Sequence, residues 1–191
     1  MKIFQTLAVS LLSLAMVQAN AQSENSKELK KGTVVFADGS SAPGFIKDNI
    51  RKDASVTFTP ETGGKKKIYA GAELTSVTIE GTKYICIKGD FFKILSEGEL
   101  SFLQKSSDAS GKPTYNGNEA IFSSGTEGNP NDYFIYNNTD KQLKLVSKKN
   151  LDEVIKASFS GSTAAIDKAK TVQGDLSRLK EAVDLYNNRN K

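Results

Sequence analysis

The sequence predicts an α+β protein: an antiparallel β meander, barrel-like or packed as a sandwich, followed by a C-terminal helical tail of two to three helices. Three observations lead to this fold class. Apolar and polar residues alternate with period two from Gly32 to about Ser147, as they do in half-buried strands. Short glycine-containing turns separate the alternating segments, as in meanders. After Ser147 the apolar period becomes that of amphipathic helices.

The first 21 residues are typical of a secretory signal peptide. Lys2 precedes an apolar run from Leu7 to Val17, and Ala19-Asn20-Ala21 supplies the small residues that a signal peptidase accepts. The run is shorter than the roughly 20 apolar residues that cross a bilayer as a helix. We therefore expect an exported protein without a membrane-spanning segment after cleavage. It would lie in the periplasm, outside the cell or at the outer membrane of a Gram-negative bacterium.

Four segments follow from these patterns. Residues 1–21 form the signal peptide, and residues 22–31, which are polar and without period, form a flexible leader. Residues 32–147 form the antiparallel β domain. Residues 148–191 form a helical segment that packs on the sheet, because amphipathic helices need an apolar surface to cover.

The β domain opens with a glycine-rich stretch that has two interpretations. Asp38-Gly39 is a turn dipeptide between two extended segments. A phosphate-binding loop needs successive backbone amides at the start of a helix, but Pro43 lacks an amide hydrogen and Gly44 leads into an extended pattern, Phe45-Ile46-Lys47. The stretch is therefore interpreted as a hairpin bend, with a contact loop for a partner as the alternative.

The rest of the β domain alternates between strands and polar connections. Further strands are predicted at 55–59, 76–80, 83–88, 91–95, 100–105, 119–122, 133–137 and 142–146. Two longer connections, 106–118 and 123–132, are rich in serine, glycine and asparagine, which is typical of mobile loops. Because loops on a rigid β scaffold commonly carry recognition, these two are the predicted contact surfaces.

Helix start signals mark the tail. Asn150 with Glu153 three residues later predicts a capping box. Ser162 and Asp175 are the N-caps expected for the two helices that follow. The last helix carries an apolar stripe on one face, formed by Leu176, Leu179, Val183 and Tyr186. Such a stripe predicts that this helix packs against the sheet.

The composition excludes several kinds of chemistry. The chain has no histidine, so it has no Ser-His-Asp triad, no Cys-His pair and no H-E-x-x-H zinc site. Its lone cysteine, Cys86, allows no intramolecular disulfide and lies in an alternating strand, where a small buried hydrophobe is expected rather than a reactive thiol. The net charge of +4 rests on scattered lysines with only three arginines, which does not predict a nucleic-acid surface.

Two sets of oxygen-bearing side chains are candidates for a site. Glu97 and Glu99 flank Gly98 at a hairpin tip; a carboxylate pair serves a glycosidase only when it is held in a cleft with about 5–10 Å between the acids, and a solvated tip offers no cleft. Residues 127–132 contain Glu127, Asn129, Asn131 and Asp132, which are calcium-like ligands. Their spacing departs from the known calcium loop, and Pro130 interrupts it.

Four stretches in order, covering most of the mature chain, carry a resemblance to a known group: "KGTVVFADGSSAPGFIK" (31–47), "KKIYAGAELTSVTIEGTKY" (66–84), "FFKILSEGELSFLQK" (91–105) and "LKEAVDLYNN" (179–188). They resemble uncharacterised secreted β-rich proteins of Bacteroidota-type bacteria, a domain of unknown function with a C-terminal helical tail. Many members carry a cysteine before the penultimate helix, where this chain has Phe159-Ser160-Gly161. The resemblance implies an exported β domain and no particular reaction.

The sequence thus predicts a non-catalytic exported envelope protein, a binding or structural module whose partner is an envelope protein or glycan. Two alternatives stay open: a small carboxylate-dependent hydrolase acting on envelope or extracellular glycans, and a carrier of an apolar ligand inside a β-barrel. No catalytic, cofactor-binding or metal-ligating residue is assigned, and no cofactor is expected.

Overall fold

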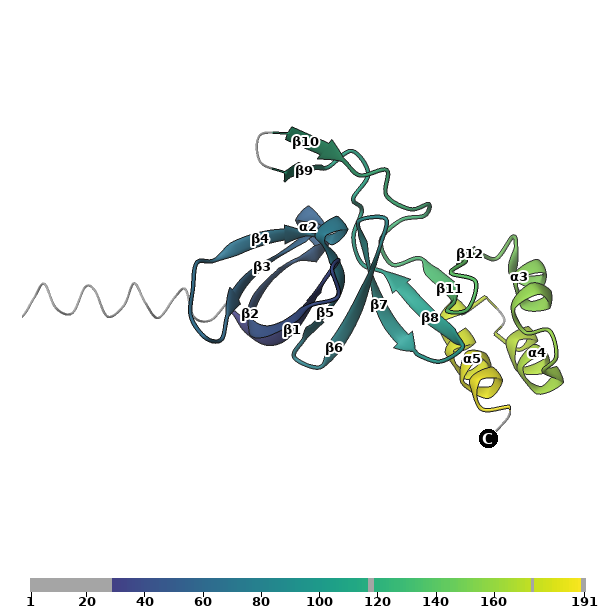
Figure 1. Ribbon diagram of the computed structural model, residues 1–191. Coiled ribbons are helices and arrows are strands. Elements are labelled where there is room, and N and C mark those ends of the chain that lie inside the picture. The colour runs from purple at the N-terminus through teal and green to yellow at the C-terminus, as the bar shows by residue number, and fades with distance from the viewer. Residues whose placement is uncertain (1–28, 117–118, 173, 190–191) are drawn as a thin grey trace, which may run out of the picture.

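The computed structural model describes residues 29–116, 119–172 and 174–189 (Figure 1). The predicted signal peptide and all but the last residues of the predicted leader lie outside this part of the chain. Among the described residues, none of the helices has both the length and the apolar content that a bilayer crossing requires.

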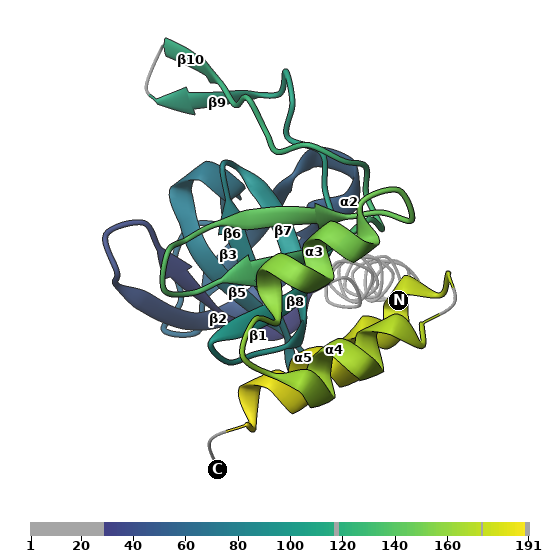
Figure 2. The same cartoon turned by 90° about the vertical axis from the view of Figure 1, so that its right-hand side faces the viewer.

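Ten strands form one antiparallel sheet that does not close into a barrel, which confirms the predicted fold class. The strands are β1 (Lys30–Phe36), β2 (Ser41–Asn49), β3 (Ser55–Pro60), β4 (Lys67–Ala70), β5 (Leu74–Ile79), β6 (Thr82–Ile87), β7 (Asp90–Ser96), β8 (Leu100–Lys105), β11 (Tyr133–Asn137) and β12 (Leu143–Val146). Their order is β12-β11-β8-β7-β6-β5-β1-β2-β3-β4. Strands β9 (Pro113–Asn116) and β10 (Glu119–Phe122) form a separate hairpin that projects from the body (Figures 1 and 2).

The structure departs from the predicted strands at three places. Strand β1 begins at Lys30, inside the predicted leader, because Lys30 and Lys31 pair with β2. Strand β4 was not predicted, since its lysine-rich start hides the alternation. Strand β9 lies inside the stretch 106–118, which was predicted to be a loop.

The N-terminal half of the sheet, β1 to β6, curls around its own apolar face (Figure 1). Facing positions explain the burial, because Val34 lies opposite Val77 and Ile46 lies opposite Phe58. The buried residues from these six strands are Val34, Ile46, Val56, Phe58, Leu74, Val77 and Ile79. The other face is polar, with Thr33 opposite Thr78 as an example. The curl therefore buries one apolar face in its interior, and its second face is largely polar from β1 to β5.

Strand β7 is where this arrangement changes. Phe91 packs in the core of the curl, while its neighbour Phe92 points to the opposite face and packs with Leu103 and Phe134. Phe91 and Phe92 are both fully buried. The sheet is thus apolar on both faces from β6 onward, because Ile85 and Ile87 of β6 also pack in the Phe92 cluster.

Helices cover one face of the C-terminal half. They are α3 (Leu151–Ser158), α4 (Thr163–Lys170), the short 3-10 helix η2 (Leu176–Arg178) and α5 (Leu179–Asn187); α4 and α5 lie side by side (Figure 2). The predicted stripe is confirmed: Leu179, Val183 and Tyr186 are buried against Phe102 and Ile135 of the sheet, with Leu176 partly buried beside them.

The helix caps agree with the predictions at two of three positions. Ser162 accepts a hydrogen bond from the amide of Ala165, and Asp175 accepts one from the amide of Ser177. The predicted capping box at Asn150 is wrong. The Asn150 side chain makes no cap; its Oδ1 accepts from the Ser147 amide at 2.8 Å, and its Nδ2 donates to the Leu145 carbonyl at 2.8 Å. It ties the helix start to the end of β12.

The glycine-rich opening is a hairpin bend, as predicted. The turn lies between Phe36 and Ser40, and the Phe36 amide donates a hydrogen bond to the Ser40 carbonyl at 2.8 Å. Asp38 Oδ1 accepts hydrogen bonds from the amide and the hydroxyl of Ser40, at 2.8 and 2.6 Å. Gly39 adopts a φ of 85°, which glycine accepts at no steric cost. Pro43 and Gly44 lie within β2.

Candidate binding site

A buried ion pair organises the two long loops. Asp90 begins β7 and Lys105 ends β8, and Lys105 lies opposite Phe92 in the sheet. Both side chains are 0% exposed, and Lys105 Nζ lies 3.1 Å from Asp90 Oδ2. They occupy the face of the C-terminal half that the helices do not cover, beside Phe92 and Leu103.

The loops supply every other partner of this ion pair. Asp90 accepts from the Ala109 amide at 2.7 Å and from the Ser107 hydroxyl at 3.2 Å. It also accepts from both the amide and the hydroxyl of Thr126, each at 2.7 Å. Lys105 donates to the carbonyl oxygens of residues 126, 127 and 128 at 2.8, 3.2 and 3.0 Å. Charge-assisted hydrogen bonds of this kind constrain loop conformation, so residues 107–109 and 126–128 are tied to the sheet. The mobility of the two long connections stays a prediction.

Two of the four candidate calcium ligands, Asn131 and Asp132, have hydrogen-bond partners within the chain. Asp132 Oδ2 accepts from the Asn129 amide at 2.7 Å, and Asn131 Oδ1 accepts from Arg51 at 3.5 Å. Within the described ranges, no group of three acidic, histidine or cysteine side chains could hold a metal ion. The side chains of Asn131 and Asp132 are thus engaged within the chain, which gives no support to the calcium interpretation.

A shallow hollow, which we call the loop hollow, lies where the hairpin leaves the body. Its volume is about 400 Å³. Its lining comes from the 3-10 helix η1 (Gly71–Glu73) and the start of β5, from β6 and its turn, and from the end of β10 and the residues after it: Gly71, Leu74, Cys86, Lys88, Phe122 and Ser123. Phe122 is 66% exposed at its rim. The volume is in the range of ligand pockets.

Close backbone contacts form the floor of the loop hollow. A Cβ on Gly71 would lie 2.2 Å from the carbonyl oxygen of Gly89, so only glycine fits there. The Ser123 hydroxyl donates to the Lys88 carbonyl at 2.7 Å and joins the chain after β10 to the turn of β6. The rim of the loop hollow is therefore held in place on both sides.

Cys86 forms part of the wall of this hollow and is half-buried. Burial raises the pKa of its thiol well above the usual value, because a thiolate is poorly solvated there. The side chain packs against the core of the curl. Both observations agree with the prediction of an unreactive thiol.

The two candidate acids at the β7–β8 turn are held apart by separate partners. Glu97 pairs with Lys83 of β6 at 2.6 Å. Glu99 accepts a hydrogen bond from Arg189, which lies beyond the end of α5, at 2.7 Å. It also accepts one from the hydroxyl of Tyr186, within α5, at 3.2 Å. Arg189 lowers the pKa of the Glu99 carboxyl, with Tyr186 contributing. A general acid in a glycosidase has a raised pKa, so this geometry does not favour catalysis by the pair.

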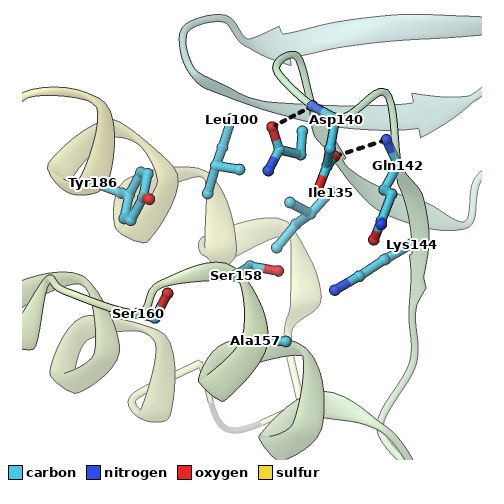
Figure 3. A pocket seen from close by; sticks show the side chains of 10 residues that line it. Leu100, Ile135, Asp140, Gln142, Lys144, Ala157, Ser158, Ser160 and Tyr186 are labelled. Atoms are coloured by element: carbon cyan, nitrogen blue, oxygen red, sulfur yellow. Dashed lines mark hydrogen bonds between the residues drawn. The ribbon is translucent and has the colours of Figure 1, made fainter.

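A second cavity, the seam pocket, lies between the sheet and the tail (Figure 3). Its volume is about 110 Å³. Leu100 and Ile135 of the sheet and Tyr186 of α5 form apolar parts of its lining. Its polar lining comes from two sides: Asp140, Gln142 and Lys144 from the β11–β12 hairpin, and Ser158 and Ser160 from the end of α3.

The sequence did not indicate Asp90 and Lys105, although they organise the loops. Asp90 follows a glycine and falls between the predicted strands 83–88 and 91–95. The available signal was positional: each charge falls at an inward position of a strand, two residues from Phe92 or Leu103. Charges at inward positions are expected to be paired, but the sequence does not say with which residue.

Comparison with family models, with curated proteins and with solved structures found no match to this chain. The resemblance to secreted proteins of Bacteroidota-type bacteria stays a prediction.

Proposed function

We propose that this protein is an exported, non-catalytic binding module of the cell envelope, and that the loop hollow with Phe122 is its contact surface. One observation carries the proposal: a large apolar side chain, 66% exposed, stands beside an apolar hollow on loops that a buried ion pair fixes. Exposed apolar groups around a concavity are typical of interaction sites.

The rigid loops support binding because they lower its entropic cost. Ordering a loop on binding consumes part of the interaction energy. Here Asp90 and Lys105 hold residues 107–109 and 126–128 by hydrogen bonds inside the protein. A partner would therefore meet a contact surface that is already shaped.

The lining favours a protein segment over a glycan as the partner. Leu74, Cys86 and Phe122 suit an apolar side chain inserted into the loop hollow. Glycan sites commonly use broad aromatic platforms, and the chain has no tryptophan. The partner that we propose is thus an envelope protein that presents an exposed apolar residue.

The two alternatives gain less support. The hydrolase would use Glu97 and Glu99, which are engaged in separate ion pairs. The apolar-ligand carrier would need space inside the curl, where fully buried side chains such as Val34, Ile46 and Phe91 fill the interior.

A retention experiment tests the contact surface. Mature protein is immobilised, exposed to envelope extract, and the retained proteins are identified by mass spectrometry. We expect Phe122→Ser to lose a retained protein that the unmodified chain keeps. Ile68→Ser is the matched control, because Ile68 is 64% exposed on β4, outside the lining of the loop hollow. Equal losses in both variants, or no loss in either, would contradict the proposal.

Export is tested separately by the intact mass of the secreted protein. The A-x-A pattern at Ala19-Asn20-Ala21 predicts a chain that begins at Gln22. A persistent full-length species in the membrane fraction would contradict cleavage.

A further inference from the structure

Two opposite charges line the seam pocket without neutralising each other. Asp140 and Lys144 both belong to its lining. Among the described residues, no ion pair joins them to each other or to any other group. By contrast, the buried Asp90 and Lys105 are engaged by each other and by the loops. The seam pocket therefore presents one positive and one negative group to whatever enters it.

The negative group is held in a fixed orientation. Asp140 Oδ1 accepts a hydrogen bond from the amide of Gln142 at 3.0 Å. The same turn is closed by Asn137, whose Oδ1 accepts from the amides of Thr139 and Asp140 at 2.8 and 3.4 Å (Figure 3). One carboxylate oxygen of Asp140 thus orients the group, and the other can receive a further donor.

The positive group lies on the helix-covered face of the sheet. Lys144 is opposite Ile135 in the β11–β12 pair and is half-buried. Its side chain extends from β12 toward the end of α3 (Figure 3). A half-buried ammonium group next to apolar side chains gains from an anionic partner, because it has already lost part of its hydration. The Ser158 and Ser160 hydroxyls, on the opposite side of the pocket, add hydrogen-bond donors for the same partner.

The size and floor of the pocket limit the ligand further. A cavity of about 150 Å³ holds a molecule the size of benzene, and the seam pocket has about 110 Å³. Leu100 and Ile135 offer contact for a small apolar group. A simple anion would meet repulsion from Asp140, and a simple cation would meet repulsion from Lys144. A small molecule with both charges satisfies both groups.

We propose that the seam pocket binds a small α-amino acid as its zwitterion. The ligand carboxylate pairs with Lys144 and accepts from the serine hydroxyls, the ligand ammonium donates to Asp140, and a short side chain lies on Leu100 and Ile135. This site is separate from the loop hollow and does not depend on the function proposed there.

Titrations of the mature protein with chosen probes test the charge requirement. Glycine and alanine are followed by methyl and amide chemical shifts of residues 100, 135 and 157, up to about 10 mM because affinities near 1 mM suit a ligand of this size. We expect saturable shifts with both. N-acetylglycine lacks the ammonium and glycinamide lacks the carboxylate, so each is expected to bind at least about tenfold more weakly, the loss typical of one charged hydrogen bond. Leucine is expected to bind more weakly than alanine because of the pocket volume.

Variants assign the two charges. Lys144→Met should reduce alanine affinity by at least about tenfold, and Asp140→Asn should do the same. Lys149→Met is the matched control, an exposed lysine outside the pocket lining, and should leave the affinity unchanged. No saturable shift with glycine or alanine would overturn the proposal. So would N-acetylglycine or glycinamide binding as well as glycine, or both pocket variants retaining full affinity while folded by circular dichroism.

Discussion

The two halves of the sheet bury their apolar side chains in different ways. In the N-terminal curl, alternating strands bury one face against themselves, and the other face is largely polar from β1 to β5, with Thr33 opposite Thr78. In the C-terminal half, both faces are apolar, so two different covers are needed. Helices cover one face. The loops around Asp90 and Lys105 border the other. The C-terminal half, whose apolar faces are covered by helices and loops, also carries the projecting hairpin and the seam pocket.

This difference has a physical cause. A strand whose sequence alternates strictly can be completed by curling, because its polar face needs only water. Strand β7 carries Phe91 and Phe92 in succession, and no curl can bury both at once. Helices or loops must then cover the second apolar face, and the backbone amides and carbonyls of those loops need hydrogen-bond partners. The ion pair satisfies several of these groups.

The largest expected effect comes from breaking the buried ion pair. Lys105→Met leaves the Asp90 carboxylate buried without its cation and removes three hydrogen bonds to the loop carbonyls. We expect the free energy of unfolding to fall by about 3–5 kcal/mol, as measured by chemical denaturation. The double variant Asp90→Asn/Lys105→Met should recover part of the loss, because no net charge stays buried. A loss below about 1 kcal/mol for Lys105→Met would contradict the anchoring role.

Cavity-forming variants compare the two cores directly. Ile46→Ala removes packing in the curl, and Leu179→Ala removes packing between the tail and the sheet; both side chains are fully buried. Each should cost about 2–5 kcal/mol. Because the two halves share one sheet, we expect one cooperative transition in each variant. Two separated transitions in Leu179→Ala would show that the C-terminal half unfolds on its own.

A smaller effect is expected at Glu99, and it depends on pH. Arg189 holds the Glu99 carboxyl pKa below its usual value of 4.5 in the folded protein. A depressed pKa contributes stability that is present above the unfolded value and is lost as the pH falls through the folded one. Glu99→Gln should therefore be slightly less stable than the unmodified chain at pH 7, and the difference should vanish as the pH falls below 4.5. A difference that persists at pH 2 would assign the effect to something other than the charge. Thermal unfolding at several pH values measures it.

The smallest effect is expected for a surface ion pair that matches the buried one in type. Lys83 and Glu97 lie 2.6 Å apart, with side chains 45% and 58% exposed. Lys83→Met should change the free energy of unfolding by about 0–1 kcal/mol, because water screens exposed pairs. Denaturation in the same buffer as Lys105→Met gives the contrast. A loss comparable to that of Lys105→Met would contradict the claim that burial makes the Asp90–Lys105 pair the stronger one.

The sequence by itself determined the elements that depend on local pattern. Alternation predicted most strands of the sheet, Asp38-Gly39 predicted the first turn, and the stripe of α5 predicted its buried face. These features follow from a period of two or 3.6 residues and from turn chemistry, which neighbours along the chain specify. The exception at Asn150 shows the limit, because its side chain found partners at the end of β12 instead of at the helix.

Only the tertiary structure decided the features that join distant residues. Asp90 and Thr126 are 36 positions apart, and both candidate sites are built from several elements. The sequence shows that a charge at an inward position needs a partner, but many groups have the right chemistry. The partner is set by which loops the folded sheet brings over that face. For the same reason Glu97 and Glu99, two positions apart and alike in chemistry, lie in separate ion pairs, because Lys83 of β6 and Arg189 after α5 reach the turn from different parts of the chain.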